Sequence, residues 1–249
     1  MLRKNQRNAI DVSLNNNFKS GVHFHATGTG KSWIALELAL AYNNLNKTKN
    51  ILWLCEQKSI LIEQFNISTI RNKGYENIYK KFIVINYTEK KDSDWYSKVN
   101  IASFWKKPIL LVINRSFLIS RKKYEKLKID VGLIIHDECH SIKNNTTKIF
   151  YEHTLSKYPN ISCIGFSATP YLDIEPFKEI LSEYTIYDAF RDKVIVPPKI
   201  KWIKSNKILD DEDILEICKD SIDELVYKKI VVWCGIIEKC YELSRLWKK

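Results

Sequence analysis

The stretch FHATGTGKSW, residues 24–33, decides how the rest of this sequence is interpreted. It ends in Gly-Lys-Ser, as does the phosphate-binding pattern G-x-x-x-x-G-K-[ST], but His25 occupies the position of that pattern's first glycine. The apolar segment GVHF (21–24) precedes the loop, and the helical pattern KSWIALELALAYNNL (31–45) follows it directly. A strand, a glycine-containing loop and a helix in this order form the context that a phosphate-binding loop requires. We therefore interpret the stretch as a nucleotide site with a substituted first position.

The residue types of this loop suit the binding of phosphate. Successive backbone N–H groups at a helix N-terminus form a concavity in which an anion is favoured. Gly28 and Gly30 allow the backbone to curl closely around the phosphates. Lys31 is predicted to reach the β- and γ-phosphates, and the Ser32 hydroxyl to bind Mg²⁺. The alternative is a Gly-Thr turn that caps an ordinary helix, and the preceding strand argues against it.

Short apolar, β-branched segments alternate with helical patterns along most of the chain, which is typical of a parallel sheet built from βαβ units. Because these segments are continuously apolar, we expect strands that are covered on both faces. Helices are predicted at 31–45 and 59–71. The predicted strands are GVHF (21–24), ILWLC (51–55), FIVIN (82–86), ILLVI (109–113), VGLIIH (131–136) and SCIGF (162–166).

The pattern changes after IVPP (195–198), where two prolines interrupt the chain. A strand KIKWIK, a helix over 209–227, a strand KIVVWC (229–234) and a helix over 235–249 are predicted beyond it. The last βα unit resembles the opening of a further α/β domain. We predict a first domain over 1–198, a linker with a connecting helix over 199–228, and the beginning of a truncated second domain over 229–249.

A second polar motif, HDECH, follows the apolar segment VGLII (131–135). Asp137 could hold Mg²⁺ through water, and Glu138 could orient or deprotonate an attacking water. An Asp-Glu pair alone is usually a solvated strand end, but its place downstream of a phosphate loop makes it more specific. Cys139 and His140 also suggest zinc. We reject zinc because adjacent residues of an extended chain point in opposite directions and no second ligand cluster is present.

Composition limits the cellular setting and the partners. The net charge of +11 favours an acidic partner such as nucleic acid, although an AT-rich genome, as of a large DNA virus, a plasmid or a low-GC bacterium, would produce the same charge. The six cysteines form no C-x-x-C pair, so we expect reduced, buried thiols. No long apolar run suggests a membrane span, and the N-terminus lacks the apolar core of a secretory signal. We predict an intracellular protein, in the host cytoplasm or a virion if viral, with no membrane partner.

Three further segments extend the pattern: LRKNQRNAID (2–11), the sequence D-E-C-H (137–140), and FSATPY (166–171). Together with HATGTGKS they resemble the motifs of superfamily-two helicases and translocases of the D-E-x-H type. The resemblance is to the branch that contains restriction-enzyme motor subunits and viral helicases. That branch commonly has an apolar residue at the position of His25, where histidine is unusual. The resemblance covers 1–198 and implies a RecA-like P-loop NTPase domain, with a mostly parallel central sheet flanked by helices.

The resemblance implies an ATP site with Mg²⁺. Gln6, with Arg3, would recognise adenine. Catalysis would rest on Lys31, on Asp137, which would bind Mg²⁺ together with Ser32, and on Glu138, which would activate water. The phosphates would be held by Thr27, Gly28, Thr29, Gly30, Lys31 and Ser32. The residues that couple the nucleotide to movement between domains would be His140, Ser167 and Thr169.

Two segments resemble the family's nucleic-acid contacts, CEQKSILIEQ (55–64) and INRSFL (113–118). Each follows a predicted strand and opens a helix, where backbone N–H groups can meet phosphates. The alternative is that both are ordinary surface turns. The branch favours DNA over RNA. The residues predicted to contact nucleic acid are Gln57, Lys58, Ser59, Arg115 and Ser116.

One departure from the family pattern concerns the second motor domain. That domain carries a Q-x-x-G-R-x-x-R motif whose arginines complete the ATP site, and no such motif occurs here. Arginine supplied across an interface contributes roughly 10³–10⁵ in rate in related systems. We therefore expect the first motor domain of an ATP-dependent helicase or translocase, weak or inactive without a second RecA-like domain in cis or trans. The alternative is a subunit of a transcription, replication or restriction complex that binds ATP or nucleic acid without turnover. A P-loop metabolic kinase would leave the S-A-T segment unexplained.

Overall fold

The computed structural model describes residues 2–46, 48–56, 65, 67–72, 74–87, 97, 99, 104, 107–127, 129–197, 210–225 and 237–247. The chain divides into two compact units, Met1–Pro197 and Pro198–Lys249. Among the described residues, no helix is both long enough and apolar enough to cross a membrane.

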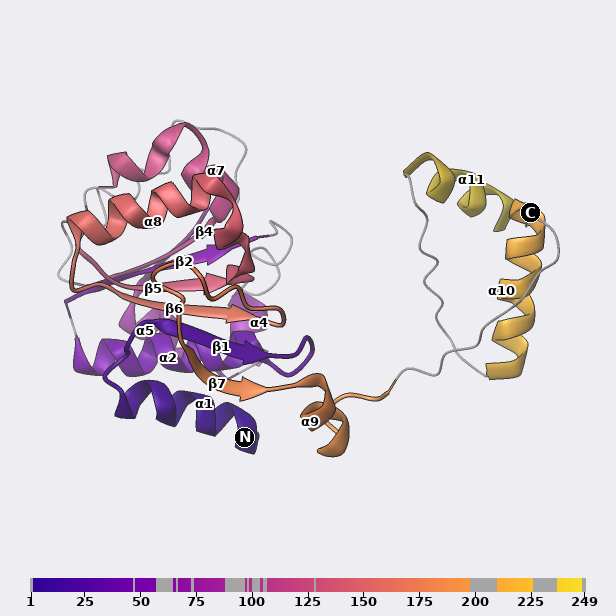
Figure 1. Cartoon of the computed structure of the whole chain (residues 1–249), viewed down its shortest axis with the longest axis horizontal. Helices are drawn as coiled ribbons and strands as arrows, with labels where there is room; N and C mark the ends of the chain where they lie inside the picture. Colours follow the sequence, from indigo (N-terminus) through magenta and orange to yellow (C-terminus); the bar gives the residue numbers. More distant parts are fainter. Residues whose placement is uncertain are drawn as a thin grey trace. The chain divides into compact units, whose positions relative to one another are not determined.

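The first unit is built on a seven-stranded sheet in which all neighbouring strands run parallel (Figure 1). The order across the sheet is β3-β4-β2-β5-β6-β1-β7. Because the strands are parallel, their carboxyl ends meet at one edge, where ligands bind in open α/β sheets. The strands are β1 (Gly21–His25), β2 (Asn50–Cys55), β3 (Ile83–Tyr87), β4 (Ile109–Asn114), β5 (Val131–Asp137), β6 (Ser162–Ser167) and β7 (Ile180–Tyr184).

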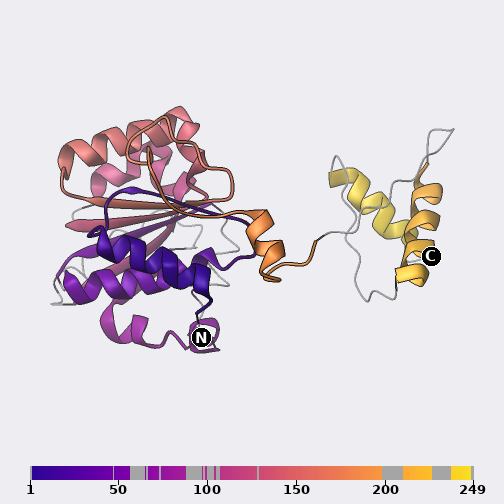
Figure 2. The ribbon, with the colours of Figure 1, turned by 60° about the horizontal axis from the view of Figure 1, so that its bottom comes forward.

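Helices cover both faces of this sheet (Figures 1 and 2). One face packs against α1 (Lys4–Asn15), α2 (Lys31–Leu45) and α5 (Asn77–Lys81). The other packs against α7 (Arg115–Ile119), α8 (Asn145–Lys157) and the 3₁₀ helix η1 (Ser120–Lys126). The other elements among the described residues of this unit are α4 (Ile67–Asn72), the 3₁₀ helix η2 (Cys139–Lys143) and α9 (Ile186–Arg191).

Strand β2 shows how the apolar segments produce two cores. Ile51, Trp53 and Cys55 belong to the core on the α2 side, whereas Leu52 and Leu54 belong to the core on the α8 side. Successive side chains of a strand point to opposite faces, so a continuous apolar run fills both layers. The predicted α/β class with a central parallel sheet flanked by helices is confirmed.

The predicted elements agree with the structure over most of the first unit. Strands β1 to β6 all overlap the predicted segments, and α2 begins and ends where the pattern predicted. Strand β7 and the helices α1 and α8 were not predicted. Of the predicted helix over 59–71, residues 67–71 lie in α4, and 59–64 lie outside the described residues.

The second unit contains two described helices. Helix α10 (Asp211–Leu225) lies within the helix predicted over 209–227, and α11 (Ile237–Trp247) lies within that predicted over 235–249. The predicted strands at 199–204 and 229–234 lie outside the described residues. The assignment of 229–249 to a second RecA-like domain therefore stays a prediction.

Candidate active site

The loop between β1 and α2 adopts a conformation that needs glycine at two positions. Gly28 has φ 81° and Gly30 has φ 92°, both in the left-handed region that other residues rarely adopt. A Cβ atom at Gly30 would also collide with the side-chain amide of Gln6. The loop is closed from within, because the backbone N–H and the hydroxyl of Thr29 both donate to the carbonyl oxygen of Ala26, at 3.4 and 2.6 Å. Thr29 is thus a buried brace, whereas Thr27 is exposed.

Helix α1 reaches this loop through Gln6, whose side chain is buried. The Gln6 oxygen Oε1 accepts from the backbone N–H of Arg3 at 2.9 Å, and Gln6 Nε2 donates to the carbonyl oxygen of Thr29 at 3.3 Å. Arg3 and Gln6, predicted from the resemblance to recognise adenine, are therefore next to each other and next to the loop. This contact fixes the start of α1 against the phosphate-binding segment.

A cleft of about 970 Å³ opens beside the start of α1. Arg3, Asn5 and Asn8 line it from α1, Tyr184 from the end of β7, and Lys193 from the turn after α9. Sites for small molecules and cofactors are commonly clefts of roughly 300–1,000 Å³. The cleft lies next to the loop. Val194 lines the cleft, and the next residue, Ile195, lies close to Gly28 of the loop.

The acidic pair at the end of β5 faces the loop lysine. Lys31 Nζ lies 3.7 Å from Glu138 Oε1 and donates to the carbonyl oxygen of His25 at 3.4 Å. Burial and the neighbouring Glu138 charge raise the pKa of Asp137 to about 6, while Lys31 opposes the shift. Glu138 has φ 55°, a strained conformation of the kind that clusters at functional sites. Segments far apart in the sequence thus bring a cation and two carboxylates together.

The donor set suits a hard divalent cation. Asp137 supplies carboxylate oxygens at the end of β5, and Ser32 a hydroxyl in the first turn of α2; such oxygen ligands suit Mg²⁺. Among the described ranges, no three His, Cys, Asp or Glu residues gather closely enough to hold a metal by themselves. A bound Mg²⁺ would therefore depend on phosphate oxygens and water, as Mg²⁺ usually does in nucleotide sites.

The three predicted coupling residues lie in one hydrogen-bonded series. His140 Nδ1 lies 3.3 Å from Glu138 Oε2 and 3.1 Å from Ser167 Oγ. Ser167 Oγ in turn accepts from the backbone N–H of Thr169 at 3.0 Å. Since Ser167 ends β6, the series connects the acidic pair of β5 with the segment that follows the next strand. A change at Glu138 would therefore reach Thr169 through two side chains.

Arg115, which we predicted to contact nucleic acid, has a buried side chain. Its guanidinium is buried and donates to both carboxylate oxygens of Glu56, at 2.7 and 2.8 Å, and to the hydroxyl of Thr147 at 2.7 Å. This pairing lowers the pKa of Glu56. The side chain of Arg115 thus ties the ends of β2 and β4 to the start of α8, and its predicted contact with nucleic acid stays a prediction. Ser116, by contrast, is exposed in the first turn of α7.

The other nucleic-acid residues predicted, Gln57, Lys58 and Ser59, lie outside the described residues. Sequence reasoning missed Glu56 and Thr147 as the partners of Arg115. An acidic residue directly after an apolar strand was the available signal for Glu56, but nothing local marked Thr147. These partners come from segments that the fold alone brings together.

The family profile described as "Type III restriction enzyme, res subunit" matches residues 1–172, well over half of the chain. The chain belongs to this family. The match includes the loop, the acidic pair and the Ser167–Thr169 segment, and it confirms the predicted superfamily-two relationship. No curated relative matches the chain.

Two solved structures have the same fold as the first unit of this chain. The Pyrococcus furiosus Hef helicase domain matches with a TM-score of 0.54 and 16% identity, over 95% of this chain and 51% of that one. The ATP-dependent Type ISP restriction-modification enzyme LlaBIII bound to DNA matches with a TM-score of 0.55 and 16% identity, over 78% of this chain and 16% of that one. The first unit thus has a RecA-like fold, and the chain spans about half or less of each matched protein.

Cys139, which directly follows the acidic pair, has its thiol in the core. It is buried against Gly165 of β6, and burial raises the pKa of its thiol. The argument from an extended chain was wrong, because residues 139–143 form η2. A protonated thiol packed in the core is a poor metal ligand, since metals bind the thiolate.

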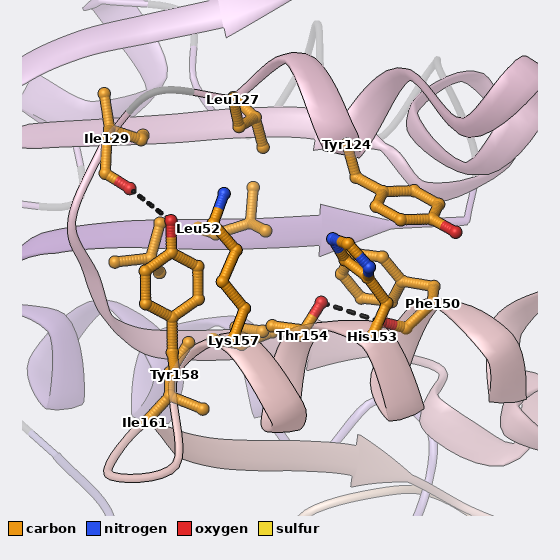
Figure 3. Close-up of a pocket in the computed structure, with 12 residues that line it drawn as sticks. Leu52, Tyr124, Leu127, Ile129, Phe150, His153, Thr154, Lys157, Tyr158 and Ile161 are labelled. Carbon is orange, nitrogen blue, oxygen red and sulfur yellow. Dashed lines mark hydrogen bonds between the residues drawn. The ribbon is translucent and has the colours of Figure 1, made fainter.

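A second cavity lies between η1 and α8, on the face of the sheet that these helices cover (Figure 3). Its volume is about 30 Å³, and its walls include Leu52, Ile129 and Phe150. Tyr158 donates to the carbonyl oxygen of Ile129 at 3.4 Å across one side of it (Figure 3). This volume suits a water molecule or a methyl group and no larger ligand.

Proposed function

We propose that this chain is the first motor domain of an ATP-dependent helicase or translocase, which hydrolyses ATP with Mg²⁺ and moves on nucleic acid. The observation that carries the proposal is that Lys31 lies next to Asp137 and Glu138, beside a loop that needs glycine at two positions. The chain also belongs to the family of restriction-enzyme res subunits. Loop, lysine and acidic pair are the parts that phosphoryl transfer to water requires.

In this proposal the loop binds the triphosphate through backbone N–H groups at the N-terminus of α2. Lys31 leaves Glu138 and turns to the β- and γ-phosphates, which releases the Glu138 carboxylate to orient and deprotonate the attacking water. Mg²⁺, when bound by Ser32 and Asp137, would neutralise charge that develops on the phosphates. Asp137 must be ionised to bind the cation, so its raised pKa makes this step sensitive to pH.

The base of the nucleotide is placed in the cleft beside α1. Arg3 and Asn5 line this cleft, and Gln6 links the same helix to the loop. Within the described part of the chain, the Gln6 amide nitrogen and carbonyl oxygen each make one hydrogen bond, so one N–H and one lone pair would remain for a base edge. Two spare groups of opposite sense match adenine, which presents a donor beside an acceptor.

Coupling to movement is assigned to His140, Ser167 and Thr169, which would sense the state of Glu138 through their hydrogen bonds. Their partner is proposed to be a second RecA-like domain, in cis or trans. The relative LlaBIII was solved bound to DNA, which supports DNA over RNA as the track. The predicted intracellular location stays a prediction.

The second candidate is a subunit that binds ATP or nucleic acid without turning over. Lys31 resting against Glu138 favours it, because this pair occupies the carboxylate that hydrolysis needs. Nucleotide binding without hydrolysis would distinguish this candidate from the first.

The deciding experiment is steady-state ATP hydrolysis by the full chain, alone and with single-stranded DNA, duplex DNA or RNA. Lys31→Ala serves as the blank, and Lys148→Ala, an exposed lysine of α8, as the matched control. Stimulation by one nucleic acid that is lost only in Lys31→Ala supports the motor and identifies its track. Binding of ATP without turnover under every condition supports the second candidate, and no binding at all contradicts both.

A further inference from the structure

A buried polar series runs beneath the nucleotide loop and involves both histidines of β1. Ser13 Oγ of α1 lies 2.8 Å from His23 Nε2, and His23 Nδ1 lies 2.7 Å from Ser182 Oγ of β7. The same Ser182 oxygen lies 2.9 Å from His25 Nε2. His25 is 1% exposed and is the residue that replaces the first glycine of the loop pattern. We call Ser13, His23, Ser182 and His25 the histidine ladder.

Both rings of the ladder are neutral near pH 7, because burial lowers the pKa of His23 to about 3 and that of His25 to about 4. A neutral imidazole has one donor and one acceptor nitrogen. Ser182 has a single hydroxyl proton, so at least one ring must donate to it. Ser182 therefore couples the tautomers of the two rings, because it can donate to only one of them, and its hydrogen bonds hold each ring in place.

The ladder ends at the loop. His25 Nδ1 is buried and has no hydrogen-bond partner in the described part of the chain. An unpaired polar atom in the core is unfavourable, and an apolar side chain at this position would avoid it. A histidine here therefore lowers the stability of the fold. Its presence suggests that the ring has a role that an apolar side chain cannot perform.

Main-chain contacts link the ladder to the groups that would hold phosphate. The His25 carbonyl oxygen accepts from Lys31 Nζ at 3.4 Å, and the next N–H, of Ala26, donates to the Tyr184 carbonyl oxygen of β7 at 3.0 Å. The Ala26 carbonyl oxygen in turn accepts both hydrogen bonds of Thr29. The backbone at 25–26 is therefore the point from which Lys31 and the loop are positioned.

The ladder also compensates for a weak point in the sheet. Strand β7 is an edge strand, and its register with β1 shifts between Val22 and His23. Beyond the shift, His23 lies opposite Ser182 and His25 opposite Tyr184. The bonds of Ser182 to both rings hold β7 in the register that places the Tyr184 carbonyl oxygen against Ala26.

We infer that His25 is a positioning residue for nucleotide binding, which acts through the histidine ladder to fix the backbone at 25–26 and thereby the resting place of Lys31. The inference rests on the proposed function and deepens it. It assigns a role to the residue by which this loop departs from the common pattern, and it gives Ser182 of β7 a part in the nucleotide site.

The test is the affinity of the full chain for a non-hydrolysable ATP analogue with Mg²⁺, measured by calorimetry at pH 7.5. Ser182→Ala removes the shared hydroxyl, and His25→Gly restores the common pattern while it removes the ring. His25→Gln keeps a polar atom near the position of Nε2. Ser20→Ala is the matched control, since its hydroxyl accepts from the Cys163 N–H at the amino end of the sheet.

We expect Ser182→Ala and His25→Gly to weaken binding by about tenfold, as for loss of one hydrogen bond. His25→Gln should stay within about twofold of the wild type, as should Ser20→Ala even if it unfolds at a lower temperature. Equal affinities in all variants, with only their melting temperatures lowered, would overturn the inference and leave the proposed function standing. Failure of the wild-type chain to bind the analogue would overturn the proposed function, and the inference with it.

Discussion

The buried pair of Arg115 and Glu56 predicts an asymmetry between two substitutions. The Arg115 side chain is 7% exposed, whereas that of Glu56 is 36% exposed. Arg115→Met leaves a carboxylate that water can still reach, and we expect a loss of about 2 kcal/mol in the free energy of unfolding. Glu56→Ala leaves a buried guanidinium that keeps only Thr147, and we expect a loss of about 3–4 kcal/mol. The double variant should cost less than the sum, because the two side chains interact directly.

The assay is urea unfolding of the full chain, followed by tryptophan fluorescence, because Trp53 is buried in the core of the first unit. Lys148→Ala breaks an exposed ion pair with Glu152 and should cost no more than about 0.5 kcal/mol. A loss for Arg115→Met that equals or exceeds that for Glu56→Ala would refute the reasoning. So would an Arg115→Met chain of unchanged stability that binds DNA less well, since that is the behaviour of a surface contact.

Three further predictions concern acid sensitivity, the loop and the cation. Burial lowers the pKa of His23, His25 and His136 below the value of about 6.5 in an unfolded chain, so only the unfolded chain takes up their protons as the pH falls. The free energy of unfolding should be highest above pH 6.5. Below that pH it should fall by about 1.4 kcal/mol per pH unit for each of these histidines. Urea unfolding midpoints measured from pH 7.5 to 5 would show this decline, and a flat profile would contradict it. Gly30→Ala should abolish binding of the ATP analogue, because of its φ of 92° and the collision with Gln6, and retained binding would show that the loop can rearrange. Because the pKa of Asp137 is raised to about 6, Mg²⁺ affinity in the presence of nucleotide should rise between pH 5 and 7, and Asp137→Asn should remove that dependence.

Sequence reasoning succeeded where a local pattern carried the information. The apolar strands β2, β4, β5 and β6 identified themselves because almost every residue of each is buried, and the motifs at the carboxyl ends of the strands converged because the strands are parallel. Strand β7 reads I-L-S-E-Y, in which Ile180 and Glu183 are exposed, as suits an edge strand. From the sequence, its Ser182 would be expected at the surface. In the structure it is buried, and its hydroxyl is hydrogen-bonded to two histidines.

The pairing of Arg115 with Glu56 was missed for a related reason. A charged residue after a strand is normally solvated, and its burial here depends on Glu56, which lies 59 residues earlier in the chain. No spacing rule connects the two residues, since they meet only because β2 and β4 are neighbours in the sheet. Pairings of this kind follow from topology, which a single sequence constrains weakly.

The order of the sheet also bears on how the chain is synthesised. Among the strands that the structure describes, β1 is made first, yet its two neighbours, β6 and β7, are made last. Until residues 162–184 have emerged, the nascent β1 has neither partner, and unpaired strand edges favour aggregation. A ribosome that pauses before β6 would hold the phosphate loop complete in sequence but without its support. The loop at the beginning of the chain therefore acquires its shape only when the end of the first unit has been translated.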